Sequence, residues 1–159
     1  DSAIGVAQHE GWETQVLGYD IQGEAKEVAK QHAAIALDQK SQGKRVMLFS
    51  GGELTVTVAD IYGDGGPNQE YLMALAEALN GEAGIYALAC DTDGVDGSKD
   101  VAGAYINNST IARAQDAGEN LHAQLEGHNS HQFFKAIDDL IITGPTNTNV
   151  NDFRVIVIE

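Results

Sequence analysis

The sequence is poor in cysteine and in basic residues, and each scarcity excludes a class of protein. The single cysteine, Cys90, rules out an internal disulfide framework, and its place in an apolar run predicts a buried, unreactive thiol. Only 9 Lys and Arg accompany 24 Asp and Glu, which gives a net charge of −15. That balance argues against a nucleic-acid backbone or an anionic membrane as partner. No apolar run approaches the ~18 residues that a membrane helix needs.

The length of 159 residues suits one domain with its own core, so we expect a single domain over residues 1–159. The N-terminus lacks a basic segment followed by an apolar one, so no signal peptide is predicted, and a cytoplasmic location is compatible with this. Because the chain begins with Asp1 rather than Met, we expect it to derive from a longer polypeptide. If its ligand is an anion, a partner or a further domain has to supply cations.

The pattern of apolar residues predicts an α/β fold of three layers, with a mixed, mostly parallel sheet and helices on both faces. Helices are expected over 24–42, after Pro67, and in three short pieces between 109 and 137. Strands are expected over 14–19, 45–49, 54–58, 85–90, 140–143 and 153–158, with 102–106 either a short strand or a loop.

Two short links constrain how these strands pair. The four-residue link from Ser50 to Glu53 allows a hairpin between 45–49 and 54–58 but no parallel crossover, so an antiparallel pair is predicted there. Its paired glycines either make the turn or let the backbone approach a ligand closely. The link from 140–143 to 153–158 is also too short for a helical crossover, so the last strand is predicted to lie antiparallel to 140–143 or elsewhere in the sheet.

Three of the predicted strands end in polar loops, and ligands of α/β sheets bind at the carboxyl ends of strands. Ser50-Gly-Gly-Glu53 follows the strand over 45–49, and Asp91-Thr-Asp-Gly-Val-Asp-Gly97 follows the strand over 85–90. The run from Gly144 to Asp152 follows the strand over 140–143. If the three strands are neighbours, their loops form one site.

The acidic loop offers carboxylate oxygens for a hard cation through Asp91, Asp93 and Asp96. A calcium loop is disfavoured, because its fifth position is Val95 and its twelfth is Ala102. Magnesium held by one or two carboxylates together with substrate phosphates fits better. The alternative is a structural turn in which the Asp side chains bond their own backbone.

The glycine-rich segment Gly63-Asp-Gly-Gly-Pro-Asn-Gln-Glu70 leads into a helix, and free N–H groups at a helix start favour an anion. The spacing is neither that of a dinucleotide-binding fingerprint nor that of a Walker A loop, and a plain turn is the alternative. The neutral hydrogen-bonding residues from Thr146 to Asp152 suit hydroxyls and carboxylates, or form an ordinary surface loop. His128 and His131 lack a nearby third ligand, so no zinc site is expected.

Five segments in this order resemble the C-terminal domain of the type-2 glycerate kinase family, which is known as the MOFRL domain. They are Ser50-Gly-Gly-Glu-Leu-Thr-Val56, Gly63-x-Gly-Gly-Pro-Asn-Gln-Glu70, Asp91-Thr-Asp-Gly-Val-Asp-Gly97, Ala102-Gly-Ala104 and Thr143-Gly-Pro-Thr-Asn-Thr-Asn-Val-Asn-Asp-Phe153. The resemblance covers the chain from about residue 44 to the end. Some relatives carry Arg where this chain has Pro67, so a charge-neutralising role there is in doubt.

The resemblance implies the C-terminal domain of a two-domain enzyme whose active site lies in the cleft with an N-terminal α/β domain absent here. Such enzymes transfer the γ-phosphoryl group of ATP to D-glycerate with a divalent metal, typically giving 2-phosphoglycerate. The partners implied are D-glycerate and the missing domain, with a homodimer left open, and the isolated piece is expected to be inactive. The alternatives are a hydroxypyruvate reductase that uses NAD(P)H and a non-catalytic binding or oligomerisation module.

On this interpretation each polar loop receives a role. Asp91 and Asp96 are the expected catalytic residues, holding Mg²⁺ or orienting the attacking hydroxyl, and Asp91 and Asp93 are the expected metal ligands. The residues expected to contact phosphate or substrate are Glu53, Gly65, Gly66, Asn68, Asn149, Asn151 and Asp152. The general base and the main cationic group are expected in the missing domain.

Overall fold

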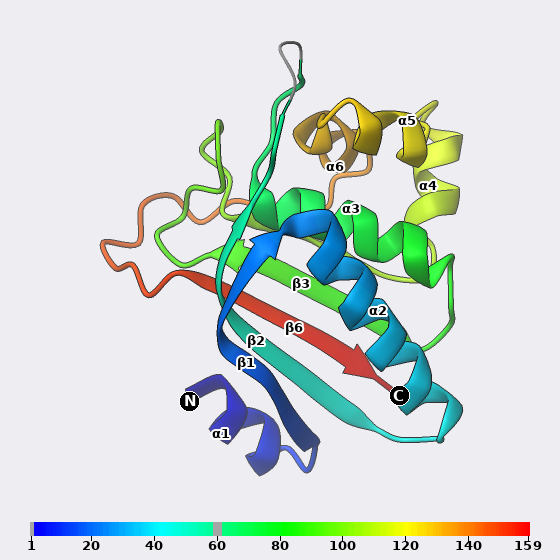
Figure 1. The fold of residues 1–159 in the computed structure, drawn as a ribbon, viewed down its shortest axis with the longest axis vertical. Coiled ribbons are helices and arrows are strands. Elements are labelled where there is room, and N and C mark those ends of the chain that lie inside the picture. The colour runs from blue at the N-terminus through cyan, green and yellow to red at the C-terminus, as the bar shows by residue number, and fades with distance from the viewer. Residues whose placement is uncertain (1, 59–61) are drawn as a thin grey trace.

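The computed structural model of the chain describes residues 2–58 and 62–159, and in them one six-stranded sheet has the order β1-β2-β6-β3-β4-β5 (Figure 1). The strands are β1 (Glu13–Glu24), β2 (Val46–Thr55), β3 (Ile85–Asp91), β4 (Gly103–Ile106), β5 (Leu140–Ile141) and β6 (Asp152–Ile158). The helices are α1 (Ser2–His9), α2 (Ala25–Ser41), α3 (Pro67–Leu79), α4 (Thr110–Asp116), α5 (Leu121–Glu126) and α6 (Ser130–Ala136). The predicted α/β fold with a mixed sheet is confirmed.

The strand pairing differs from the expected mostly parallel arrangement. Among the described strands only β1 and β2 pair in parallel, through the crossover helix α2, whereas β2–β6, β6–β3, β3–β4 and β4–β5 are antiparallel. The reason is that two connections reverse the chain without a helix: residues 92–102 before β4 and residues 142–151 before β6. Strand β6 does not pair with β5; it lies between β2 and β3, which is the second of the two predicted placements.

The predicted hairpin over 45–58 is wrong, because β2 runs without a turn from Val46 to Thr55. Gly51 and Gly52 lie inside this strand, and the backbone of β1 passes close beside them. A Cβ on Gly52, which has a φ of +110°, would lie 2.2 Å from the carbonyl oxygen of Ile21. The two glycines therefore admit a neighbouring strand rather than a turn.

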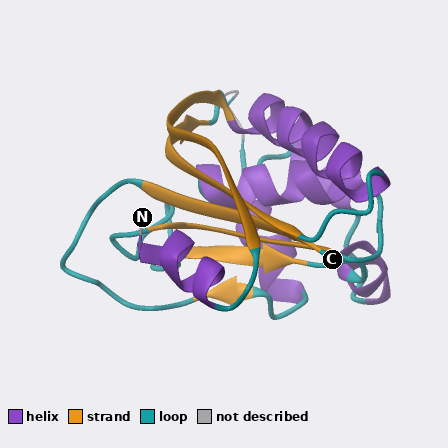
Figure 2. Cartoon of the chain, turned by 90° about the horizontal axis from the view of Figure 1, so that it is seen from below, coloured by secondary structure: helices purple, strands orange, loops and turns teal. Residues whose placement is uncertain are grey.

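Helices cover the two faces of the sheet unequally. The long helix α2 and helix α3 pack on one face, and α4, α5 and α6 pack around α3. Figure 2 shows the short helix beside the N-terminus, α1, on the side of the strands opposite to α2. Alternation along β6 buries Asp152, Arg154, Ile156 and Ile158 beneath the helices. Among the described residues, no helix has the length and apolar character needed to span a bilayer.

Cys90 lies on the less covered face and is half-buried rather than fully buried. Burial, reinforced by the charge of Asp91, raises the pKa of its thiol to about 11. The thiol is therefore protonated at neutral pH, which agrees with the predicted lack of reactivity.

Candidate functional site

The three polar loops meet at one edge of the sheet. Strand β6 runs antiparallel to both of its neighbours, so its first residue lies beside the last residues of β2 and β3. Asp152 pairs with Gly52 on one side and with Asp91 on the other. The sequence predicts that these loops form one site only if their strands are neighbours. The strands are neighbours, and the ends of the loops are in contact.

Hydrogen bonds join the acidic loop to the loop before β6. The Thr92 hydroxyl donates to the carbonyl of Asn151 at 2.7 Å and accepts from the amide of Val150 at 2.9 Å. The amide of Thr146 donates to the carbonyl of Asp93 at 3.2 Å. Each loop supplies donors and acceptors to the other, so these hydrogen bonds hold the two loops together.

Asp91 and Asp93 lie half-buried at the start of the acidic loop. Asp91 Oδ1 accepts from the amide of Asp93 at 3.0 Å, and Asp93 Oδ1 accepts from the amide of Val95 at 2.8 Å. Asp93 Oδ2 also accepts from Asn149 Nδ2 at 3.4 Å. Burial, followed by the charges of Asp93 and Asp152, raises the pKa of Asp91. A cation beside Asp91 would relieve this concentration of negative charge.

Asp96 is buried and caps helix α3 from outside the helix. Its Oδ1 accepts from the amide and the side-chain Nδ2 of Asn68, at 3.0 and 3.2 Å. Its Oδ2 accepts from the amide and the side-chain Nε2 of Gln69, at 2.9 and 3.0 Å. Burial raises the pKa of Asp96 to about 6, and the four hydrogen bonds oppose that rise.

In this position Asp96 does not suit the role expected from the sequence, which was to hold Mg²⁺ or to orient the attacking hydroxyl. Four donors fill the roughly four acceptor sites of a carboxylate, so neither oxygen is available to a metal or a substrate hydroxyl. The same contacts alter the expected anion site, because the free N–H groups at the start of α3 already hold a carboxylate of the chain itself. The sequence did not reveal this pairing, since Asp96 lies 27 residues from Gln69.

Asn68 links Asp96 to Asp152 beneath the loops. Its Nδ2 donates to both carboxylates, at 3.2 Å to Asp96 and at 2.7 Å to Asp152. Its Oδ1 is buried and has no partner among the described residues. Asp152 also accepts from the amide of Leu54 at 3.3 Å, so one buried carboxylate holds β2, α3 and β6 in register.

Arg154 is a buried cation that the sequence analysis did not single out. Its guanidinium donates to Asp152 Oδ2 at 2.6 Å, to the carbonyl of Gly51 at 2.7 Å and to the Ser50 hydroxyl at 3.3 Å. It neutralises Asp152 and orders the paired glycines of β2. The available signal was its charge, since an arginine inside an otherwise apolar strand requires buried partners.

His32 on α2 stacks edge-on against Tyr71 and contacts its hydroxyl at 2.8 Å. Burial, and then the charge of Arg154, lowers the pKa of His32 to about 4. The imidazole is therefore neutral at physiological pH. His32 is therefore a buried core residue whose hydrogen bond is made inside the protein.

The remaining predicted residues lie around this network at different depths. Glu53 is exposed on β2, opposite Gln22 of β1. Asn149 and Asn151 are exposed in the loop before β6, where Asn149 Oδ1 accepts from the amide of Asn151 at 2.9 Å. Gly66 touches the acidic loop, since a Cβ there would lie 2.3 Å from the carbonyl of Asp96. Gly65 lies in the same loop and donates its amide to the Ser98 hydroxyl at 3.3 Å.

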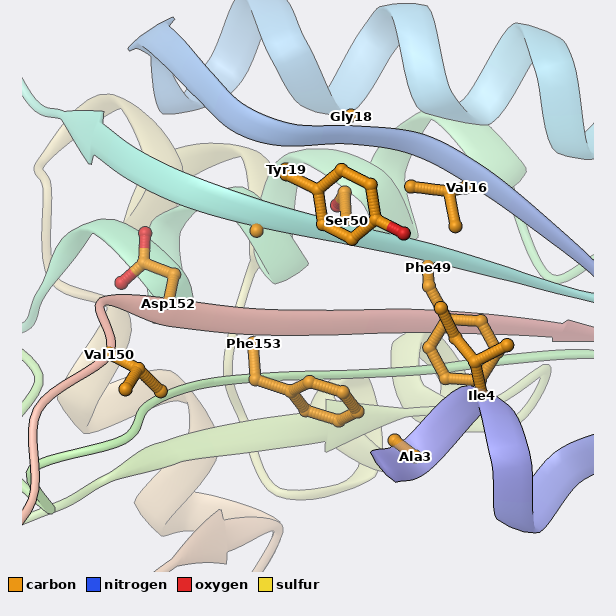
Figure 3. Close-up of a pocket in the computed structure, with 11 residues that line it drawn as sticks. Ala3, Ile4, Val16, Gly18, Tyr19, Phe49, Ser50, Val150, Asp152 and Phe153 are labelled. Carbon is orange, nitrogen blue, oxygen red and sulfur yellow. The ribbon is translucent and has the colours of Figure 1, made fainter. Parts of the chain in front are cut away.

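Two cavities flank this region. One of about 190 Å³ lies beside α1 and is lined mainly by the apolar side chains of Ile4, Val16, Tyr19, Phe49 and Phe153 (Figure 3). The other, of about 250 Å³, lies along the glycine-rich loop from Gly63 to Gly66. Among the described residues, no group of three or more His, Cys, Asp or Glu could enclose a metal ion.

Comparison with known proteins gives relatives over the whole chain. A Pyrococcus horikoshii protein named glycerate 2-kinase is 32% identical over 96% of this chain, and a Thermotoga maritima protein named D-glycerate 2-kinase is 34% identical over 98%. An Agrobacterium vitis protein that carries the provisional name hydroxypyruvate reductase is 47% identical over 99%. This chain spans 35%, 38% and 42% of these three relatives, respectively.

The crystal structure of the Thermotoga maritima glycerate kinase matches the fold closely. It superposes with a TM-score of 0.95 at 34% identity, covering 100% of this chain and 39% of that one. Residues 46–152 match the MOFRL family, and that range contains the glycine-rich loop, the acidic loop and the loop before β6. The chain therefore belongs to the MOFRL family.

Proposed function

We propose that this chain is the C-terminal domain of a glycerate 2-kinase, which transfers the γ-phosphoryl group of ATP to D-glycerate and gives 2-phosphoglycerate. The observation that carries the proposal is the meeting of the acidic loop, the paired glycines and the loop before β6 around Asp152. The names of the 32% and 34% identical relatives support the reaction class. The site is proposed to lie in a cleft with an N-terminal domain.

Asp91 is the proposed magnesium ligand in this reaction. Its carboxylate is half-buried, and burial together with neighbouring carboxylates raises its pKa. Asp93 would share the ion, because Mg²⁺ commonly takes one or two carboxylates and completes its shell with water and substrate phosphates. When bound there, the ion would supply positive charge that offsets the negative charge developing on the transferred phosphoryl group.

The other loop residues are proposed to position the substrates. Glu53, Asn149 and Asn151 present exposed polar side chains at the same edge of the sheet and would contact glycerate. Gly65 and Gly66 would contact substrate through their backbone. Asn68 and Asp152 would act indirectly, together with Asp96, by holding α3 and β6 in place beneath the loops.

The test is to incubate the full-length enzyme containing this chain with D-glycerate and magnesium-ATP and to follow the products by phosphorus NMR. We expect a 2-phosphoglycerate resonance together with ADP. An Asp91→Asn variant is expected to lower kcat/KM at least about 100-fold, since it removes charge from the metal site. An unchanged kcat/KM in that variant would contradict the assignment of Asp91. A 3-phosphoglycerate signal would keep the kinase and overturn the proposed orientation of glycerate.

The second candidate is a hydroxypyruvate reductase, which the provisional name of the 47% identical relative favours. The same preparation distinguishes the two. Consumption of NADH on hydroxypyruvate, without any phosphorylated product, would replace the kinase proposal by this one.

A further inference from the structure

A second concave region lies along the glycine-rich loop. Its cavity of about 250 Å³ is lined by Val56 and Val58 after β2, by the loop from Gly63 to Gly66, and by side chains of α3 and α6. Gly66 lines this cavity and also touches the backbone of Asp96. The cavity therefore adjoins the proposed site and is separated from Asp96 by one loop.

The cavity has a buried carboxylate in its wall. Glu70 on α3 is 3% exposed. Its Oε1 contacts His128 Nδ1 at 2.7 Å and lies 3.8 Å from Lys26 Nζ. Its Oε2 has no partner among the described residues, and Glu70 lines the cavity. One oxygen is thus held by two basic side chains, which leaves the other as a fixed acceptor.

Two serines add hydroxyl groups to the same cavity. Ser130, at the start of α6, is 1% exposed and lies against the glycine-rich loop, since a Cβ on Gly65 would fall on its Oγ. Ser130 lines the cavity, and its hydroxyl has no hydrogen-bond partner among the described residues. Ser98 also lines the cavity, and its Oγ accepts from the amide of Gly65 at 3.3 Å. Glu70 and Ser130 are therefore the buried polar residues of this cavity, whereas Ser98 is exposed and its hydroxyl also donates to Asp64 Oδ1 at 3.3 Å.

This arrangement selects against two classes of ligand. A phosphate is an anion at neutral pH and would meet the negative charges of Glu70 and Asp64, which both line the cavity. A divalent cation is disfavoured, because Glu70 Oε1 already contacts His128 Nδ1 and lies 3.8 Å from Lys26 Nζ, whose charge would repel the ion. A ligand that presents two adjacent hydroxyl groups suits it better, since one can donate to the carboxylate and the other can pair with a serine.

We infer that this cavity binds a vicinal diol, with Glu70 as the acceptor, Ser130 as the second contact and His128 as the residue that orients Glu70. The inference rests on the proposed function for the two diols available: the ribose of ATP and the 2,3-hydroxyl pair of D-glycerate. A carboxylate that accepts from a ribose hydroxyl is a recurrent device of nucleotide sites. Val56 and Val58 also line the cavity and add apolar surface beside these polar groups.

The test compares each diol with an analogue that lacks one hydroxyl, in the full-length enzyme. Dissociation constants are measured by calorimetry for ATP against 2′-deoxy-ATP and 3′-deoxy-ATP, and for D-glycerate against D-lactate. We expect the unaltered enzyme to prefer one diol, and Glu70→Gln to weaken that diol about tenfold or more while leaving its deoxy analogue unchanged. The pair that responds identifies the source of the diol.

A matched control lies on the same helix. Glu77 pairs with His122 at 2.8 Å on the outside of the molecule, so Glu77→Gln removes the same kind of contact away from the cavity. It is expected to leave every dissociation constant unchanged. Ser130→Ala is the second test variant, in case Glu70→Gln does not fold, and it should reduce the same preference.

Two binding results would contradict the inference. Equal binding of diol and deoxy analogue in the unaltered enzyme overturns the inference, and so does a preference that survives in both Glu70→Gln and Ser130→Ala. Because binding is measured apart from turnover, the proposed function is tested separately. If the enzyme phosphorylates glycerate but shows no preference that depends on Glu70, the proposed function stands and the inference about the cavity fails. If the preference depends on Glu70 but no phosphorylated product forms, the inference about the cavity stands and the proposed function fails.

Discussion

Asp96 has the sequence context of a catalytic carboxylate, but in the folded chain it caps the N-terminus of helix α3. Its place in an acidic loop after a buried strand is typical of a metal ligand. In the folded chain it accepts from the backbone and side chains of Asn68 and Gln69, which satisfies the N–H groups that the start of α3 leaves unpaired. Arg154 plays the complementary part, as a cation placed wholly among acceptors. Asp96 and Arg154 therefore hold neighbouring segments of the chain in place. Asp91 stays partly exposed, as a proposed metal ligand has to be.

The burial of Asp96 predicts an unusual dependence of stability on pH. Its folded-state pKa of about 6 lies above the ordinary value of 3.8. The stabilisation from its protonation is therefore fully present below about pH 4 and is lost as the pH rises through about 6. As the pH rises through this window, the melting temperature of the unaltered enzyme should fall relative to that of Asp96→Asn. The fall corresponds to a loss of ~2–3 kcal/mol in the free energy of unfolding. Thermal melting of both proteins between pH 4 and pH 7.5 measures it, and a flat difference would show that Asp96 ionises normally.

At the scale of elements, the paired glycines of β2 determine how the sheet is built. The backbone of β1 passes close beside them, and the register between the two strands shifts in this region. The carbonyl of Gly51 also accepts from Arg154, so the same segment connects the sheet edge to the buried polar network. A side chain at this point would separate β1 from β2 and move the start of α2, which follows β1 directly.

Gly52→Ala is expected to destabilise the protein by at least about 3 kcal/mol, because it combines an unfavourable φ with a backbone clash. The matched control is Gly5→Ala in α1, where a Cβ would meet nothing within 4 Å. That change should be neutral or should stabilise by up to about 1 kcal/mol, as alanine favours a helix over glycine. Urea unfolding of both variants checks the pair. Similar midpoints for the two would refute a special role for Gly52.

For the whole molecule, the decisive feature is the shortage of available cations. The net charge is −15, and the cation nearest the proposed site, Arg154, is buried and occupied by Asp152 and Gly51. Lys99 is paired with Asp64 at 3.0 Å and Lys26 with Glu126 at 3.3 Å. Under the proposed function, transfer of a phosphoryl group requires positive charge at its equatorial oxygens, so this chain would need cations from elsewhere.

Residues 1–159 expressed alone are therefore expected to fold and to lack kinase activity. One continuous core of buried side chains connects α2, α3 and the sheet, which supports independent folding. Glycerate phosphorylation should be at least about 10³-fold slower than in the full-length enzyme, which is the scale of a missing transition-state cation. Circular dichroism establishes folding and an ADP-release assay measures the rate. A folded piece that turns over at the rate of the full-length enzyme would show that the chain carries the complete site.

Much of the fold could be predicted from local pattern, because amphipathic periodicity and helix-start signals are properties of neighbouring residues. The helices over Ala25–Ser41 and Pro67–Leu79 and the strand over Ile85–Asp91 follow from such signals. The order of the strands could not, because pairing depends on residues far apart in the chain. The hairpin prediction failed for this reason, since Gly51-Gly52 has the same sequence whether it turns or admits β1.

The sequence by itself determined the class of fold, the order of the polar loops and the family, because these depend on residue types and their spacing. Tertiary structure alone decided which carboxylates face outward and which are used inside. Asp91 and Asp96 are alike in sequence, but the start of α3 lies against one of them and leaves the other half-exposed. The physical reason is that the state of a carboxylate depends on its burial and on its donors, and in Asp96 every donor comes from a distant part of the chain.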